Sequence, residues 1–165
     1  MIDSYIHQYG KRLYGLCITL CTNSFEADDL YQDTWLKVVE NISKYDRTRP
    51  FEPWLTRICV NTFRNTLRRF ARSPIWNGFS SSEEKDAVFN AIPAPTPDDY
   101  STLHETIKRL PEKLKMTIIL FYFQGMDINS TAQVLSIPAG TVKSRLNKAK
   151  KMLRELLKNE SDLPF

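Results

Sequence analysis

The segment from Ser130 to Leu153 constrains the fold of this chain more than any other stretch. Its apolar side chains fall at the spacing by which a short helix, a turn of three or four residues and a second helix share one small core. These apolar positions are Ala132, Leu135, Ile137, Val142 and Leu146. The segment therefore predicts a helix-turn-helix.

The second helix of this pair is strongly basic. Between 138 and 154 it carries six lysines and arginines and no acid, a density that a phosphate backbone attracts. With Val142, Leu146, Ala149 and Leu153 facing inward, the outward side chains are those of Lys143, Ser144, Asn147, Lys148 and Lys151. Lysine can donate to guanine acceptors or to phosphate, and asparagine can pair with adenine. Nucleic acid is therefore the first partner to consider.

Composition limits the alternatives. A chain of 165 residues with 42% apolar content can form packed cores in one domain or in two small ones. Three cysteines within amphipathic patterns favour buried thiols in a reducing cytoplasm over a disulfide framework. Neither histidine lies at a recognised zinc spacing from Cys17 and Cys21, and the longest apolar run, 118–123, is too short to span a bilayer. We therefore expect a cytoplasmic protein, not membrane-embedded, with no metal, cofactor or small-molecule substrate.

Two amphipathic helices open the chain. Ile6, Leu13, Leu16, Cys17 and Leu20 predict a first helix of about twenty residues. Ser24 is then the predicted N-cap of a second helix from 25 to 42. The second helix has two faces: Ala27, Leu30, Tyr31, Val38 and Ile42 are predicted to point inward, and Asp29, Gln32, Asp33, Leu36 and Glu40 outward.

The outward face of this second helix is acidic in its N-terminal half. Asp28 and Asp29 could simply complement the helix dipole, which is worth a few tenths of a kcal/mol each and up to about 1. That interpretation leaves Gln32, Asp33 and the adjoining Trp35 unexplained. The alternative is a docking face for a basic partner helix.

A basic loop precedes a third helix. Residues 44–50 break the periodicity, and Pro53 suits the first turn of a helix that runs to Arg72. One stripe of this helix is apolar: Trp54, Leu55, Ile58, Phe63, Leu67 and Phe70. A second stripe consists of Arg57, Asn61, Arg64, Arg68 and Arg72. Like charges one turn apart repel, so an external polyanion would stabilise this stripe, although a merely solvated basic face remains an alternative.

Three aromatic residues, Tyr45, Phe51 and Trp54, interleave with the basic side chains. Rings beside basic residues are what single-stranded or flipped bases stack on. Each ring taken alone fits a core position better than a binding role. The loop and the third helix together are a candidate binding surface for single-stranded nucleic acid.

Composition changes after residue 72. The stretch 73–100 has one basic residue against five acids, and contains a serine triplet and several prolines, so 73–99 is predicted to be a flexible linker. Beyond it, Asp98 or Asp99 is predicted to cap a short helix, Pro111 to open another that ends near Gly125, and Asp127 to start the helix-turn-helix. No strand pattern competes. We predict an all-α chain with helical domains at 1–72 and 100–158, the latter containing the helix-turn-helix, and a tail at 159–165.

The two blocks resemble the extracytoplasmic-function (ECF) sigma factors of bacterial RNA polymerase, of the sigma-70 family. The first block resembles region 2 through ADDLYQDTW at 27–35, FEPWL at 51–55, Asn61 and Arg68-Arg69. The second resembles region 4 through Leu110-Pro111 and IPAGTVKSRL at 137–146. GTVKSRL also occurs in other helix-turn-helix regulators, but both blocks in this order make the resemblance specific. It covers nearly the whole chain.

The resemblance implies a non-catalytic specificity subunit that directs core polymerase to promoters. Asp29, Gln32 and Asp33 would dock on the clamp coiled coil of the largest subunit. The −10 strand would be recognised by Tyr45, Arg47, Arg49, Phe51, Trp54, Arg57, Asn61, Arg64 and Arg68. The −35 duplex would be read by Thr141, Lys143, Ser144, Arg145, Asn147, Lys148 and Lys151. The polymerase flap and an anti-sigma factor are further implied partners, and the linker would run toward the active-site cleft.

This sequence departs from the family pattern at several positions. Ser130-Thr131-Ala132 replaces a commoner Glu-Ile-Ala, Ser136 stands where glycine is usual at the corner, and Asn65 stands where many members have Asp. These departures bear on promoter specificity more than on fold.

Two other classes of function compete with a sigma factor. An ordinary DNA-binding regulator would use only the helix-turn-helix, but it would need neither the acidic face nor the separate basic and aromatic block. An enzyme acting on nucleic acid is disfavoured because the acids are not paired with histidine or cysteine at a metal or nucleophile spacing.

Overall fold

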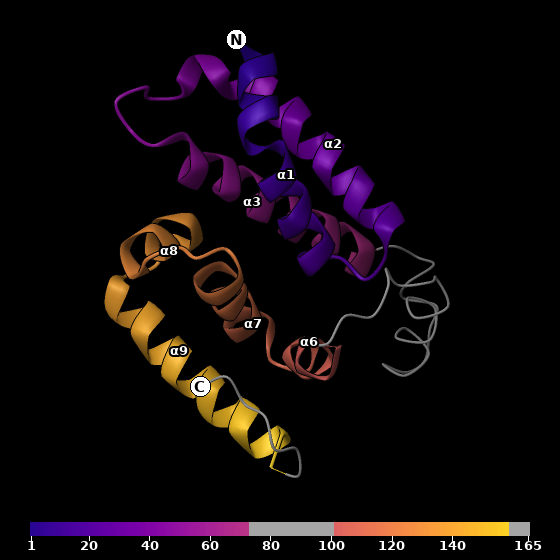
Figure 1. The fold of residues 1–165 in the computed structure, drawn as a ribbon, viewed down its shortest axis with the longest axis vertical. Helices are drawn as coiled ribbons and strands as arrows, with labels where there is room; N and C mark the ends of the chain where they lie inside the picture. Colours follow the sequence, from indigo (N-terminus) through magenta and orange to yellow (C-terminus); the bar gives the residue numbers. More distant parts are fainter. Residues whose placement is uncertain (73–100, 159–165) are drawn as a thin grey trace. The chain divides into compact units, whose positions relative to one another are not determined.

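The computed structural model describes residues 1–72 and 101–158, and every regular element within these ranges is helical (Figure 1). The chain divides into two compact units, an N-terminal unit (Met1–Pro95) and a C-terminal unit (Thr96–Phe165). The predicted all-α class with two small helical domains is confirmed. Three predictions lie outside the described residues: the linker at 73–99, the tail at 159–165 and the capping role of Asp98 or Asp99.

The N-terminal unit consists of α1 (Ile2–Leu20), α2 (Ser24–Asn41), the short 3-10 helix η1 (Ile42–Lys44) and α3 (Phe51–Arg72). The predicted N-cap of α2 was wrong by one residue. The cap is Asn23, whose side-chain oxygen accepts a hydrogen bond from the Glu26 amide at 2.8 Å, while Ser24 is the first helical residue and is exposed. The buried amide side chain of Asn23 reaches the third amide of the helix, as a good cap does.

The three long helices enclose one core. Its buried residues include Leu16, Cys17, Ala27, Val38, Cys59 and Val60. The prediction that Ile6 faces inward was wrong, since 37% of its surface is exposed. Tyr5 and Tyr9 take the inward positions of that turn instead, with ring centroids 4.0 and 5.1 Å from the Phe51 ring. Leu67 and Phe70, predicted to lie on the apolar stripe of α3, are also exposed, at 39% and 46%.

The three cysteines are free and buried, as predicted. The Sγ atoms of Cys17 and Cys59 lie 3.9 Å apart. This contact and burial raise the pKa of the Cys17 thiol, and burial raises that of Cys21 to about 12. Both thiols therefore stay protonated at neutral pH and act as small apolar groups. Within the described residues, no cluster of His, Cys, Asp and Glu side chains could hold a metal ion.

The C-terminal unit begins with α6 (Ser101–Lys108) and α7 (Glu112–Ile118). Pro111 precedes α7 and Gly125 has a φ of 65°, so the predicted start and stop are both confirmed. Between them the helix widens into a π-helix, η2 (Ile119–Phe123), which ends with a hydrogen bond from the Gln124 amide to the Ile119 carbonyl at 3.0 Å. No residue pattern predicted this π-helix, since it interrupts neither the apolar run nor the helix itself.

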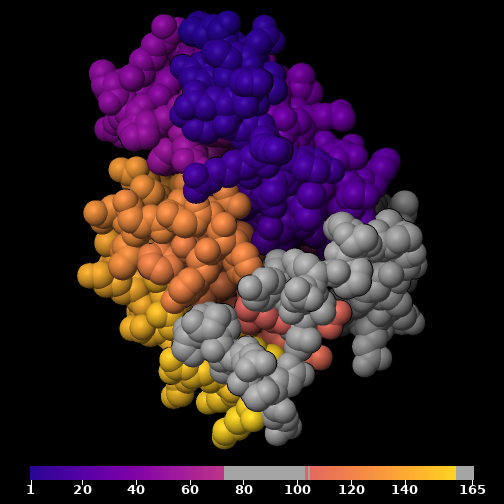
Figure 2. Space-filling model, in the orientation of Figure 1, coloured from indigo at the N-terminus to yellow at the C-terminus, as the bar shows by residue number. Residues whose placement is uncertain are grey.

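The helix-turn-helix is formed by α8 (Ile128–Leu135) and α9 (Ala139–Leu156). Asp127 caps α8, as predicted, by accepting a hydrogen bond from the Ser130 amide at 2.7 Å. This bond holds the pKa of the Asp127 carboxyl below its usual value. The two helices pack with α6 and α7 on one cluster: Ile107, Leu110, Leu114, Ile118, Ala132, Val142, Leu146, Ala149 and Leu153. In the space-filling view the stretch from α8 to α9 forms one continuous surface, from orange to yellow (Figure 2).

The corner between α8 and α9 turns at Ser136. Its backbone is left-handed, with φ 56° and ψ 47°, and among the described residues other than glycine it alone has a positive φ. The Ile137 amide then donates to the Ala132 carbonyl at 3.0 Å, which closes the end of α8. The left-handed conformation costs a residue with a Cβ about 1 kcal/mol or more, and glycine avoids this cost.

Replacing Ser136 with glycine is therefore expected to raise the free energy of unfolding by about 0.5 kcal/mol, once the greater freedom of glycine in the unfolded chain is subtracted. Urea unfolding followed by far-ultraviolet circular dichroism measures the change. Ser144→Gly is the matched control, because the same substitution inside α9 is expected to lower stability by about 0.5 kcal/mol. A Ser136→Gly protein less stable than the wild type would contradict the account of the corner.

Candidate nucleic-acid interface

Helix α9 presents a polar face opposite its buried one. Val142, Leu146, Ala149 and Leu153 are buried, as predicted. The side chains predicted to point outward are all exposed: Lys143, Ser144, Asn147, Lys148 and Lys151. Thr141 and Arg145, at the edges of this face, are half-buried. The exposed face is thus a continuous row of hydrogen-bond donors with three positive charges.

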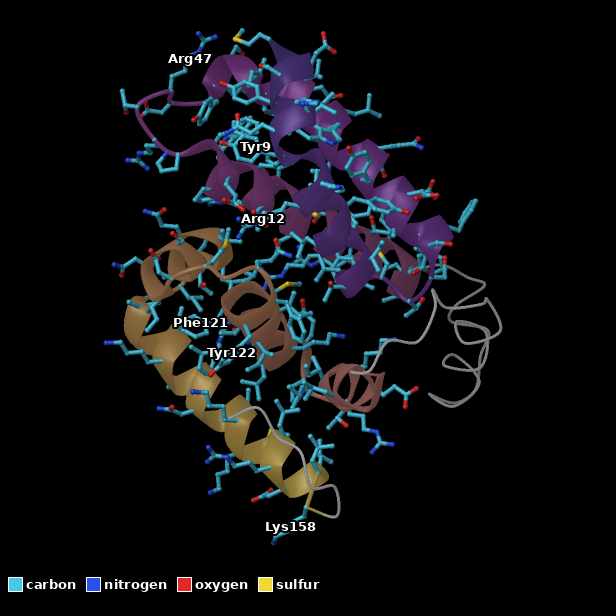
Figure 3. All side chains as sticks on the ribbon, in the orientation of Figure 1. Tyr9, Arg12, Arg47, Phe121, Tyr122 and Lys158 are labelled. Carbon is cyan, nitrogen blue, oxygen red and sulfur yellow. The ribbon has the colours of Figure 1, made fainter. Side chains whose placement is uncertain are left out.

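Two polar side chains of α9 make contacts within the unit. The Ser144 hydroxyl donates to the Thr141 carbonyl at 3.1 Å, so its oxygen remains able to accept a hydrogen bond. Lys150 points to another side of the helix, where its Nζ lies 5.4 Å from the centre of the Tyr122 ring. Lys150 is therefore separate from the outward row and holds η2 against α9. Figure 3 labels Tyr122 beside α9 and Lys158 at its far end.

The basic stripe on α3 forms as predicted. Arg57, Asn61, Arg68 and Arg72 are exposed, and Arg64 is half-buried. The opposite side of the helix buries Leu55, Thr56, Cys59, Val60 and Phe63 against α1 and α2. The stripe therefore follows one side of α3 from its second turn to its end. The buried core on the other side of α3 sets the direction in which the stripe faces.

The loop 45–50 joins η1 to α3 and is tied to a cluster of five rings. We call this the aromatic cluster: Tyr5, Tyr9, Tyr45, Phe51 and Trp54. The Tyr45 ring lies 4.9 Å from Trp54 and 5.4 Å from Phe51, measured between centroids. Tyr9 lies within the cluster, whereas Arg47 is at the periphery of the unit (Figure 3).

One member of the predicted −10 set does not fit a direct contact. Phe51 is only 4% exposed and its ring lies 4.0, 5.1 and 5.5 Å from the rings of Tyr5, Tyr9 and Trp54, so little of its surface is open to a base. Tyr45 and Trp54 are half-buried and keep exposed surface. Tyr5 and Tyr9 were not predicted to take part. Their spacing of four residues on one helix was the signal that could have found them.

The acidic face of α2 is exposed at all three predicted positions, Asp29, Gln32 and Asp33. Trp35 was predicted to adjoin this face, and that was wrong. It is 7% exposed, within the core, with its ring 6.3 Å from that of Tyr31. Trp35 is instead buried on the inward side of α2 with Thr34 and Val38.

The helix dipole does not account for the exposed aspartates of α2. The acid in the first turn of α2 is Glu26, while Asp28 and Asp29 lie in the second turn, where the helix dipole contributes little. Asp28 accepts a hydrogen bond from the Tyr14 hydroxyl at 2.6 Å, which raises the pKa of Tyr14. Neither capping nor this bond accounts for Asp29 and Asp33.

Beside the acidic face, α2 and α3 border an open groove of about 470 Å³. Its lining is mixed in charge and includes one large apolar residue: Asp33, Leu36, Lys37, Glu40, Thr62, Asn65 and Arg69. Leu36 is 62% exposed, and Val39, on the same helix, is 52% exposed. Sequence reasoning placed Leu36 and Glu40 on the outer face but did not predict the contribution of α3. The groove therefore presents both apolar and charged side chains at the surface.

None of the helices in the described part of the chain is long and apolar enough to cross a bilayer.

Two family models match this chain. Residues 5–73 match sigma-70 region 2, which covers nearly all of the described part of the N-terminal unit, and residues 100–153 match sigma-70 region 4, which includes α8 and most of α9. The two matches together span most of the chain and follow the order of a sigma-70 factor.

Relatives narrow the assignment. The chain is 28% identical to the ECF RNA polymerase sigma factor SigW of Bacillus subtilis, over 92% of this chain and 86% of the relative. It is 27% identical to the RNA polymerase sigma-H factor of Pseudomonas aeruginosa, over 94% and 85%. A solved structure of the sigma factor RpoE with the anti-sigma factor NepR, from Bartonella quintana, has the same fold: its TM-score is 0.77 at 24% identity, with 96% of this chain and 98% of that one covered. This chain belongs to the ECF sigma factors of the sigma-70 family, which direct RNA polymerase in the initiation of transcription.

Proposed function

We propose that this protein binds core RNA polymerase and holds a promoter at two points, reading the −35 element as duplex and capturing the −10 element as a single strand, with no catalysis of its own. The observation that carries the proposal is that α9 has one buried apolar face and one exposed polar face. Its four predicted inward residues are buried and its five predicted outward residues are exposed. A regulator complete in itself would need this helix but not the exposed acidic and basic faces of the N-terminal unit.

The −35 role rests on the exposed row of α9. A helix of this kind enters the major groove with its outward side chains toward the base edges. Lys143, Lys148 and Lys151 can donate to guanine or phosphate, and Asn147 to adenine. Thr141 and Arg145, at the edges of the row, suit phosphate contacts that fix its register.

Replacing Lys148 with alanine is expected to reduce the preference for the best −35 sequence over its single-base variants by about fivefold or more, because one base contact contributes about 1–3 kcal/mol of discrimination. Run-off transcription on a set of −35 variants measures this preference. Lys150→Ala is the matched control, since it removes the same charge from α9 at a side chain that faces Tyr122. Identical promoter preferences in the Lys148→Ala and wild-type proteins would refute a base contact by Lys148.

The −10 role rests on α3 and the loop before it. The stripe Arg57, Asn61, Arg64, Arg68 and Arg72 follows the helix at a spacing suited to a phosphate backbone. Arg47 and Arg49 are exposed in the loop, and Tyr45 and Trp54 offer partly exposed rings at its base. We assign Phe51 to support of these two rings and not to base contact, because it is buried.

The acidic face of α2 is proposed to dock on the clamp coiled coil of the polymerase largest subunit. Asp29, Gln32 and Asp33 supply the charge, and Leu36 at the lip of the adjacent groove supplies apolar surface. The C-terminal unit is proposed to contact the flap. Because solved structures of the fold include a sigma factor bound to the anti-sigma factor NepR and CnrH bound to the cytosolic domain of CnrY, an anti-sigma factor is a further proposed partner.

Transcription with purified core polymerase and a promoter library randomised at both elements tests the whole proposal. The expected result is initiation that depends on this protein and enriches one −10 and one −35 sequence at a fixed separation. Tight and specific promoter binding by the free protein, with no effect on transcription by core polymerase, would favour the simple regulator instead.

A further inference from the structure

The loop 45–50 contains a carboxylate that its proposed role does not require. Lys44, Arg47 and Arg49 give this segment a positive charge suited to DNA, and Asp46 lies among them, exposed. An aspartate at this position repels phosphate, so it lowers the electrostatic affinity for DNA. Its presence needs a different explanation, and its hydrogen bonds provide one.

Asp46 closes the loop into a tight turn. Its Oδ1 accepts a hydrogen bond from the Thr48 amide at 3.0 Å and another from the Thr48 hydroxyl at 2.6 Å. Its main-chain carbonyl accepts from the Arg49 amide at 3.0 Å, and its Oδ2 lies 3.6 Å from the Arg49 Nε. The Thr48 bonds and the charge of Arg49 hold the pKa of the Asp46 carboxyl below its usual value. The side chain of Asp46 thus holds both Thr48 and Arg49 in position.

The turn is also attached to the body of the unit. The Tyr45 hydroxyl donates to the Arg49 carbonyl, which joins the first residue of the loop to its far side. The Tyr45 amide donates to the Ile42 carbonyl at 3.2 Å, and the Tyr45 ring packs in the aromatic cluster. The loop therefore has a defined shape although residues 46–50 are all exposed.

We propose that Asp46 is a positioning residue for −10 recognition: it does not contact DNA but holds the tip of the loop, Arg47 and Thr48, in the shape that selects the −10 base. This inference rests on the proposed −10 role of the loop. The turn occupies both donors of Thr48 and draws Arg49 back toward Asp46. The Nη2 atom of Arg47 lies 3.2 Å from the Met1 sulfur, a weak acceptor, and the Arg47 side chain is exposed at the periphery of the unit.

Positioning and electrostatics predict opposite effects when Asp46 is changed. Removing a negative charge beside DNA strengthens non-specific attraction, whereas freeing the turn lets the tip adopt many shapes and weakens discrimination. The substitution Asp46→Asn distinguishes the positioning effect from the electrostatic one. The side-chain oxygen of asparagine can accept the same two hydrogen bonds from Thr48, but it carries no negative charge. Thr48→Val removes one of the two bonds and keeps the main-chain one.

The experiment uses the full chain with core polymerase and two promoter libraries, one randomised only at −10 and one only at −35. For Asp46→Ala we expect the ratio of initiation from the preferred −10 sequence to that from its single-base variants to fall by about fivefold or more, with the −35 ratio unchanged. Asp46→Asn is expected to keep both ratios within about twofold of the wild type, and Thr48→Val to fall between the two. Asp3→Ala, which removes an exposed acid on α1, is the charge-matched control and should change neither ratio.

Three outcomes would overturn the inference: an unchanged −10 ratio in Asp46→Ala, an equal loss in Asp46→Asn and Asp46→Ala, or a parallel loss at −35, which would indicate a general effect on the protein. The proposed −10 function fails separately, if the wild-type protein shows no −10 preference at all. The −35 library in the same assay verifies that each variant is folded and bound to polymerase, so a −10 effect with normal −35 preference supports positioning.

Discussion

Reversing the charge at both Asp29 and Asp33, by substitution with lysine, is expected to weaken binding to core polymerase by about 100-fold or more while the protein stays folded. Both side chains are exposed on α2 and neither caps the helix, whose cap is Asn23. Each reversal replaces an attraction by a like-charge contact at the docking face, which costs several kcal/mol in a protein interface. A pull-down with purified core polymerase, quantified against protein concentration, measures the loss.

The control for this double reversal carries the same change in net charge elsewhere. Asp3 on α1 and Glu105 on α6 are exposed acids outside the proposed docking face, and reversing both is expected to change the affinity by less than about threefold. Circular dichroism should show the same helicity in both double variants. Unchanged polymerase affinity in the Asp29→Lys, Asp33→Lys protein would rule out docking through this face, and loss in both double variants would point to net charge as the cause.

The sequence predicted the helices well because their signals are local. Pro111, Gly125 and Asp127 mark a start, a stop and a cap through the properties of single residues, and the structure uses all three. The inward face of α9 was predicted completely, since four apolar residues at helical spacing leave one rotation that buries them all. The left-handed Ser136 also lies at the position where the sequence departed from the usual glycine.

Predictions that depend on which helix packs against which were less successful. Phe51 was included in the −10 surface because an aromatic residue beside basic ones suggests a contact surface, but it is buried, as the core alternative for a single ring expected. Trp35, which we described as adjoining the acidic face, is buried as well. Their burial depends on partners distant in sequence: Phe51 packs on Tyr5 and Tyr9 from α1. The groove between α2 and α3 combines residues more than twenty positions apart in the same way. A period within one helix gives no information on such pairings.

Removing the buried side chain of Leu153, by substitution with alanine, is expected to unfold the C-terminal unit and leave the N-terminal unit folded. Leu153 is fully buried in the cluster that joins α6, α7, α8 and α9, and a leucine-to-alanine change at such a site costs about 2–5 kcal/mol. A helical unit of this size has little stability to spare. We expect a marked loss of helicity at 25 °C, loss of all −35 preference, and polymerase affinity through α2 within about tenfold of the wild type.

Leu156→Ala is the matched control, because Leu156 lies on the same helix three residues further on and is 45% exposed. It is expected to change the free energy of unfolding by less than about 0.5 kcal/mol and to keep the −35 preference. Urea unfolding followed by circular dichroism should then show two transitions in the Leu156→Ala protein and one in Leu153→Ala, if the two cores are independent. The two cores share no residue of the buried clusters described above, which is the physical basis for this independence. Loss of polymerase binding together with the C-terminal helicity would show instead that the N-terminal unit, with its docking face, requires the C-terminal unit in order to fold.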